Sequence, residues 1–87
     1  MKTVYKYSLR SRASVELPAG AVVLHVGLDP QGQGAFWAFV DTDNDTETRR
    51  FVVTGTGHPV PDGLEFLGTY VEGPFVWHAW EQVDGQD

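Results

Sequence analysis

The sequence has no cysteine among its 87 residues. Disulfide bonds and thiolate metal sites are therefore excluded, and apolar side chains alone must supply the core. A chain of this length buries only about 60–65% of the surface that its unfolded form exposes. We therefore predict a single domain over residues 1–87, and the lack of cysteine favours the cytosol as its compartment.

Long apolar runs are also missing. No window reaches the roughly eighteen uncharged apolar residues of a membrane span. The first twelve residues, MKTVYKYSLRSR, carry charges every few positions where a signal peptide would have an apolar block. These features predict a soluble protein of the cytoplasm that does not enter a membrane.

Cations are scarce and unevenly placed. The chain has 6 Lys and Arg against 12 Asp and Glu, for a net charge of −6. Residues 1–12 hold Lys2, Lys6, Arg10 and Arg12 and no acid, whereas the remainder holds every acid. The two parts should attract one another. An acidic body also argues against nucleic acid as a partner, since backbone binding needs clustered cations.

Helical periodicity is absent, and two-residue alternation with frequent glycine and proline takes its place. This pattern predicts an all-β fold, either a compact small barrel or a two-layer sandwich of about six to seven short antiparallel strands. The expected strands cover residues 2–10, 14–17, 21–28, 35–40, 50–54, 64–71 and 75–81. Residues 82–87 are expected to fray.

Alternation within the strands predicts which side chains form the core. Tyr5, Tyr7 and Leu9 share one face of the first strand and are expected inside. The apolar runs AVVLHVGL (21–28) and AFWAFV (35–40) are expected to pair as central strands that are at least half buried on both faces. The segment DTDNDTET (41–48) is predicted to be a polar loop.

The stretch GTGHPVP (55–61) is predicted to be a rigid turn. It lacks the third glycine, the lysine and the following helix of a phosphate-binding loop. Its two glycines free the backbone, Pro59 restricts His58 to extended conformations, and Pro61-Asp62-Gly63 is a standard turn tripeptide. Such a turn could hold the His58 imidazole in a fixed orientation for a ligand or partner.

The acidic loop resembles the start of a calcium-binding loop, because Asp41, Asp43, Asp45 and Glu47 alternate. The match then fails. Its sixth position is Thr46 where glycine is needed, and its twelfth is Val52 where a glutamate is needed. We therefore expect a solvated loop, with an adventitious calcium site as the alternative.

The residues that could carry catalysis form no known pattern. His25, His58 and His78 lack the close spacing of zinc motifs, and no serine or threonine sits in a nucleophile elbow or triad arrangement. The sequence predicts a protein that is not an enzyme and that uses no metal and no cofactor.

The aromatic side chains exceed what so small a core can hide. Trp77 and Trp80 are three residues apart, so they point to opposite faces of an extended strand. One of them is expected near the surface, either as an interface anchor or as one wall of a ligand pocket. A sheet covered on both faces, or a homodimer, would explain it equally.

Five segments together carry a family resemblance: MKTVYKYSL, LPAGAVVLHVG, AFWAFVD, VVTGTGHPVP and GPFVWHAWE. They resemble a family of small uncharacterised proteins encoded largely by bacteriophages and prophages and classed as a domain of unknown function. The resemblance implies a phage or prophage product that acts inside the bacterial host. It implies no catalytic or cofactor residue.

Two functional hypotheses remain. The first is a non-enzymatic protein-binding module that contacts a bacterial host protein or a second copy of itself. In one form of this hypothesis it is an acidic inhibitor that presents carboxylates to a basic surface of a host protein. The alternative is a protein that sequesters a small ligand or a nucleotide signal in an aromatic and histidine pocket. The candidate binding residues are His58, His78, Trp77, Trp80, Trp37, Arg49, Arg50, Asp41, Asp43, Asp45, Glu47 and Asp62.

Overall fold

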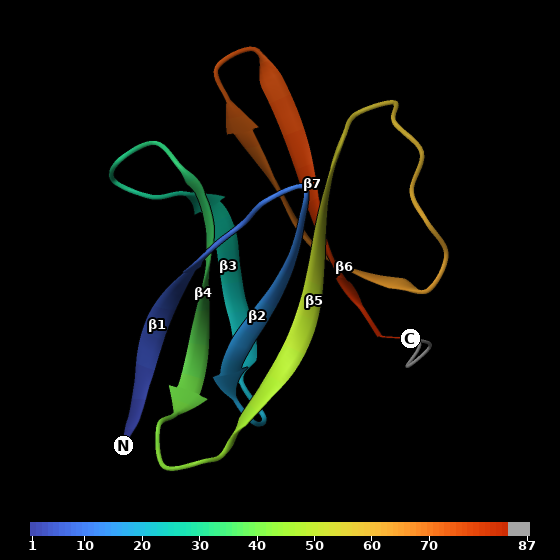
Figure 1. The fold of residues 1–87 in the computed structure, drawn as a ribbon. Coiled ribbons are helices and arrows are strands. Elements are labelled where there is room, and N and C mark those ends of the chain that lie inside the picture. The colour runs from blue at the N-terminus through green and yellow to red at the C-terminus, as the bar shows by residue number, and fades with distance from the viewer. Residues whose placement is uncertain (84–87) are drawn as a thin grey trace.

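A computed structural model describes residues 1–83 as seven antiparallel strands with no helix. The strands are β1 (Lys2–Ser8), β2 (Arg12–Pro18), β3 (Val22–Leu28), β4 (Gly34–Asp41), β5 (Thr46–Gly55), β6 (Leu64–Glu72) and β7 (Phe75–Gln82). They form a three-stranded sheet of order β1-β4-β3 and a four-stranded sheet of order β2-β5-β7-β6 (Figure 1). The all-β prediction is confirmed, and of the two expected architectures the structure has the sandwich.

The core lies between the two sheets. Phe36 of β4 and Phe51 of β5 are fully buried, and their ring centroids are 4.6 Å apart. Because alternate residues of a strand face the same side, Phe36, Ala38 and Val40 all point inward from the central strand β4. The buried core residues are Leu9, Leu17, Ala21, Val26, Phe36, Ala38, Val40, Phe51 and Ala79.

The basic N-terminal segment is attached to the acidic body by ion pairs, as its charge predicts. The Lys6 ammonium lies 2.9 Å from the Asp29 carboxylate. The N-terminal amine lies 3.0 Å from Asp43 and 3.4 Å from Asp41. These contacts hold one end of β1 to the loop between β3 and β4, and its other end to the end of β4 and the turn that follows.

Asp29 holds the loop of the β3–β4 hairpin through hydrogen bonds, and we expect the stability of the protein to depend on pH through the ionisation of this carboxyl group. Its Oδ1 accepts the backbone N–H groups of Gln31 and Gln33, each at 2.9 Å. The Gln33 bond, with Lys6 after it, lowers the pKa of Asp29. A lowered folded-state pKa means that this stabilisation is complete above the ordinary value of about 3.9 and is lost as pH falls through the folded pKa.

The test compares wild type with Asp29→Asn, which retains an oxygen acceptor but no charge. We expect D29N to be the less stable protein at pH 7 and the difference in urea midpoint to shrink once the pH falls below about 3.9 and through the folded-state pKa. Carboxyl NMR should place the Asp29 titration below its ordinary range. A stability difference that does not change across the pH range in which NMR shows Asp29 to titrate would contradict the assignment.

The structure corrects three expectations about burial and strand ends. Tyr7 and Leu9 pack in the core as predicted, but Tyr5 is 42% exposed because β1 is an edge strand paired only with β4. The polar loop predicted over 41–48 shrinks to 42–45, since β4 and β5 extend into it. Gln82 belongs to β7, and Val83 donates its N–H to the carbonyl of Gly63, so neither residue frays; residues 84–87 of the expected frayed end lie outside the described residues.

The expectation that β3 is half buried on both faces is also wrong. β3 pairs with β4 as predicted, but it is an edge strand of the three-stranded sheet. Its register shifts between Val23 and His25, which makes Leu24 an extra residue in the ladder. Val26 is consequently buried while Val22 and Leu24 face solvent.

Candidate functional site

The GTGHPVP stretch begins with a tight turn that fixes the position of His58. His58 donates its N–H to the carbonyl of Gly55 at 3.1 Å, and Gly57 has a φ of +87°. A positive φ at the third residue is what a type II turn requires, and glycine adopts it without strain. The predicted turn is therefore confirmed, and the rest of the segment continues as the loop from β5 to β6 (Figure 1).

The turn brings His58 against Trp77. A Cβ built on Gly55 would lie 3.1 Å from the His58 ring and 3.3 Å from the Trp77 ring, so both rings rest on this glycine. Two hollows flank the pair. One, of about 660 Å³, also includes Arg12, and the other, of about 370 Å³, also includes Phe75. We call the larger hollow the His58 groove.

The His58 groove runs along an open strand edge. β5 extends to Gly55, but its pairing with β2 ends at Val52 opposite Arg12. Beyond that point the N–H of Val53 donates to the carbonyl of Ser11, and no residue of β2 continues the ladder. The last residues of β5 therefore border the groove on the side that β2 leaves uncovered.

The outer face of the four-stranded sheet carries a row of residues that are direct cross-strand neighbours. Arg12 pairs with Val52, Val52 with Trp80, and Trp80 with Phe66. The Phe66 and Trp80 rings meet edge to face at 5.2 Å, and Phe66 is 55% exposed. We call this row, together with Arg50, the arginine–aromatic face.

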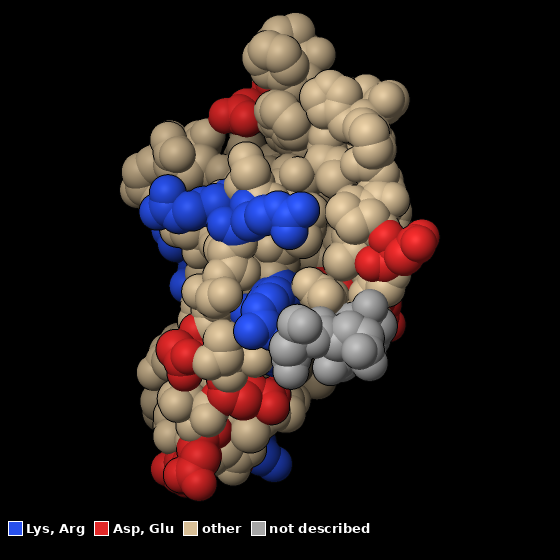
Figure 2. Space-filling view, turned by 45° about the vertical axis from the view of Figure 1, so that its right-hand side comes forward, with Lys and Arg blue, Asp and Glu red and all other residues tan. Residues whose placement is uncertain are grey.

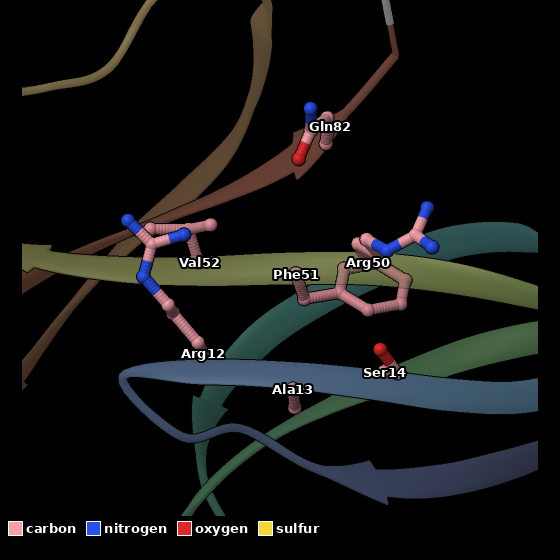
Figure 3. A pocket seen from close by; sticks show the side chains of 7 residues that line it. All are labelled: Arg12, Ala13, Ser14, Arg50, Phe51, Val52 and Gln82. Carbon is pink, nitrogen blue, oxygen red and sulfur yellow. The ribbon is translucent and has the colours of Figure 1, made fainter. Parts of the chain in front are cut away.

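Arg50 lies beside this row. Figure 3 shows Arg12 of β2 and Arg50 of β5 extending on the same side as Val52 and Gln82, above an open depression of about 230 Å³. Figure 2 shows basic side chains crossing the middle of the molecule, with acidic side chains at its lower end and others near its top and right edge. Although the protein is acidic as a whole, this face is locally basic.

Two side chains of the outer face are held by hydrogen bonds to threonines. The Trp80 indole donates to the hydroxyl of Thr54 at 3.0 Å. The two ring nitrogens of His78 lie 2.8 Å from the hydroxyl of Thr56 and 2.9 Å from that of Thr69. Because both His78 nitrogens are occupied, this imidazole connects β7 to its neighbours and offers no lone pair to a metal.

The consecutive arginines Arg49 and Arg50 lie on opposite faces. Arg49 points inward, where its Nε and Nη2 donate to the Glu81 carboxylate at 2.5 and 2.8 Å. This pairing, more than any other contact, raises the pKa of Arg49. Of these two arginines, Arg50 is therefore the one that lies on the outer face.

The predicted acidic residues are divided and partly engaged. Asp41 accepts the N–H of Asp43, which with the N-terminal amine lowers the pKa of Asp41. Glu47 accepts the N–H of Gly20 at 3.2 Å. Asp45 is exposed in the same turn, whereas Asp62 lies in the loop between β5 and β6.

The predicted separation of the tryptophans is confirmed, and it divides the aromatic residues among three places. Trp77 borders the His58 groove and donates to Glu72 at 2.9 Å, while Trp80 lies on the arginine–aromatic face. Trp37 lies on the outer face of the other sheet beside His25, with ring centroids 5.8 Å apart. The structure thus brings His58 near Trp77 but separates both from Trp37.

Arg12 and Phe66 were not among the residues predicted from the sequence. Alternation in β2 does place Arg12 outside, because Ala13, Val15 and Leu17 face inward. What the sequence lacks is the strand order, which sets Arg12 and Phe66 at the two ends of one row.

Within residues 1–83, no three His, Cys, Asp or Glu side chains come close enough to hold a metal ion. The same residues contain no helix that could cross a membrane. A family model described as "Domain of unknown function (DUF7352)" matches residues 1–87. No curated protein and no solved structure matches the chain.

Proposed function

Because the chain belongs to this uncharacterised family, DUF7352, we propose its function from its surface: it is a non-enzymatic protein-binding module. The observation that supports this most is the row Arg12, Val52, Trp80 and Phe66 across one face of the four-stranded sheet. Tryptophan and arginine are the side chains most enriched among residues that dominate binding energy at protein interfaces.

The partner that fits is a protein segment with carboxylates beside an apolar anchor. The anchor would pack on the exposed Phe66 and on the indole of Trp80, whose polar end is already bonded to Thr54. The carboxylates would meet the guanidinium groups of Arg12 and Arg50, which can bind them through two parallel hydrogen bonds. An extended segment could continue into the His58 groove and pair with the open edge of β5.

We favour this surface over the acidic turn that the inhibitor hypothesis would use. Asp41 and Asp43 are already paired with the N-terminal amine, and Glu47 with Gly20. We further propose that the protein is a phage or prophage product of the bacterial cytoplasm, so that its partner is a host protein.

The test is affinity capture by the full chain from the lysate of a bacterial host, followed by quantitative mass spectrometry. We expect Arg12→Glu and Phe66→Ser to lower recovery of a specific host protein at least tenfold, because each removes one end of the row. Arg10→Glu makes the same charge change two residues away, on the linker between β1 and β2, and should leave recovery unchanged.

Circular dichroism melts must first show that all three variants are folded. Equal recovery by wild type, R12E and F66S would overturn the assignment of the binding surface. Loss with Asp43→Asn and Asp45→Asn, but not with R12E, would instead support the acidic inhibitor.

A small-ligand site is the second candidate, and the contact of His58 with Trp77 beside Arg12 favours it. A planar anionic ligand, such as a nucleotide, would lie against the indole with its charge toward Arg12. Quenching of tryptophan fluorescence by nucleotides that is lost in Trp77→Phe would support it. No change in wild-type fluorescence at millimolar nucleotide would exclude it.

A further inference from the structure

The outer face of the three-stranded sheet carries a second row, which is apolar. Phe39 of the central strand β4 pairs with Val4 of β1 on one side and with Val22 of β3 on the other. Their exposed fractions are 43%, 48% and 55% respectively. We call these three residues the valine–phenylalanine row.

The apolar surface extends beyond this row. Leu24, the extra residue of β3, is exposed beside it. In the neighbouring cross-strand row on the same face, Trp37 lies between Lys6 and His25. Single exposed apolar residues are ordinary, but contiguous patches on a small soluble protein mark interaction sites.

We propose that a second copy of this chain covers this face, with a two-fold axis that runs along β4. Across β4 the order of side chains in this row is valine, phenylalanine, valine, so it is the same in both directions. The two-fold therefore places Phe39 against Phe39 of the partner subunit and Val4 against Val22 of the partner subunit. In an isologous interface residue i contacts residue j of the partner and j contacts i, and here both members of that contact are valines.

The charges around the face also favour a second copy over a charged partner. Two copies with a net charge of −6 each repel at long range. The charges that border this face, however, balance within the chain: Lys6 pairs with Asp29, the N-terminal amine pairs with Asp41 and Asp43, and Lys2 lies beside its cross-strand neighbour Asp41. The face therefore approaches its copy as an apolar surface whose bordering charges cancel in sum.

The size of the face sets the expected affinity. Three strands of about seven residues span roughly 23 Å by 14 Å. That area is well below the roughly 800 Å² per partner of a standard interface. We therefore expect a reversible dimer with a dissociation constant on the order of micromolar or weaker.

The first test is sedimentation equilibrium of the full chain from about 1 µM to 1 mM. We expect wild type to pass from monomer to dimer and Val22→Glu to weaken the dimer at least tenfold. Phe66→Glu is the matched control, since Phe66 has the same 55% exposure on the other sheet. A wild type that stays monomeric at 1 mM, or an F66E dimer weakened as much as that of V22E, would overturn the proposal.

The second test addresses the two-fold arrangement and does not depend on a single variant. Val4→Lys and Val22→Glu should each weaken the dimer, and the double variant V4K/V22E should recover it, because each ammonium meets the carboxylate of the partner. Within one chain the two positions are two strand spacings apart, about 10 Å, which a lysine and a glutamate can span. A mixture of V4K with V22E is therefore the control, because the two charges are then on different chains, and the mixed dimer should be tighter than that of either single variant. A double variant weaker than both single variants would exclude this axis.

The dimer goes beyond the proposed binding function, which uses the opposite sheet. Melts of each variant distinguish loss of association from loss of folding. R12E should retain the dimer while losing the host partner, whereas V22E should lose the dimer and retain the arginine–aromatic face. The two proposals can therefore fail separately.

Discussion

Truncation of Phe36 to alanine is expected to destabilise the fold by about 3–5 kcal/mol, the usual cost of removing a large aromatic side chain from a core. The Phe36 ring is fully buried between the two sheets, with Phe51 at 4.6 Å and Tyr7 stacked at 5.2 Å. An 87-residue domain has only about 4–13 kcal/mol of total stability. Phe36→Ala should therefore lose a large part of it or fail to fold.

Phe39→Ala is the matched control for this change. Phe39 lies three residues further along β4, and its side chain points to the outer face, where it is 43% exposed. We expect its truncation to cost less than about 1 kcal/mol, because the residue already contacts water. Urea unfolding should be measured at submicromolar concentration, below the dissociation constant proposed for the dimer, so that the monomer predominates. Equal losses for F36A and F39A would contradict the inward and outward assignment of β4.

This pair of residues also shows why the fold class could be predicted and the burial only in part. Alternation places Phe36 and Phe39 on opposite faces of one strand, and that holds in any antiparallel architecture. Which strands lie at the edges depends on strand order. Tyr5 and Leu24 are exposed because β1 and β3 are edge strands, and neither fact is contained in local pattern.

The candidate site, like the burial, could be predicted from the sequence only in part. The position of His58 in a turn, and the separation of Trp77 from Trp80, follow from local spacing and were predicted. The arginine–aromatic face joins Arg12 to Phe66 across four strands, so it needs three pairing registers that no local pattern supplies. Arg49 and Arg50 were both candidate binding residues, but consecutive strand residues face opposite ways, so the two lie on different faces of the sheet.

The second large effect is expected where Arg49 meets Glu81. Glu81 is only 7% exposed, and its carboxylate accepts two bonds from the Arg49 guanidinium. The remaining guanidinium bond goes to the carbonyl of Ala21 at 2.6 Å, directly before β3 begins. One side chain thus joins β5 and β7 of the four-stranded sheet to the edge of the other sheet.

Removing one partner leaves the other charged and poorly hydrated. We expect Arg49→Met and Glu81→Leu each to cost about 3 kcal/mol, at the lower end for buried pairs because the Arg49 side chain is 19% exposed. The Lys6–Asp29 pair offers a comparison, since Lys6→Met breaks an ion pair whose cation is 40% exposed. We expect K6M to cost no more than about 1 kcal/mol in urea unfolding.

The double variant R49M/E81L separates the cost of an unpaired charge from the value of the pair itself. Apolar residues of similar size can replace a buried ion pair at little cost, since the desolvation of both charges disappears with them. We therefore expect the double variant to be more stable than either single variant, with a coupling energy of about 2–3 kcal/mol in the double-mutant cycle. Additive losses would show instead that each side chain acts alone, Arg49 mainly through its bond to Ala21. In that case Arg49 would stabilise the protein by connecting the two sheets through its bond to Ala21, and the ion pair with Glu81 would add little.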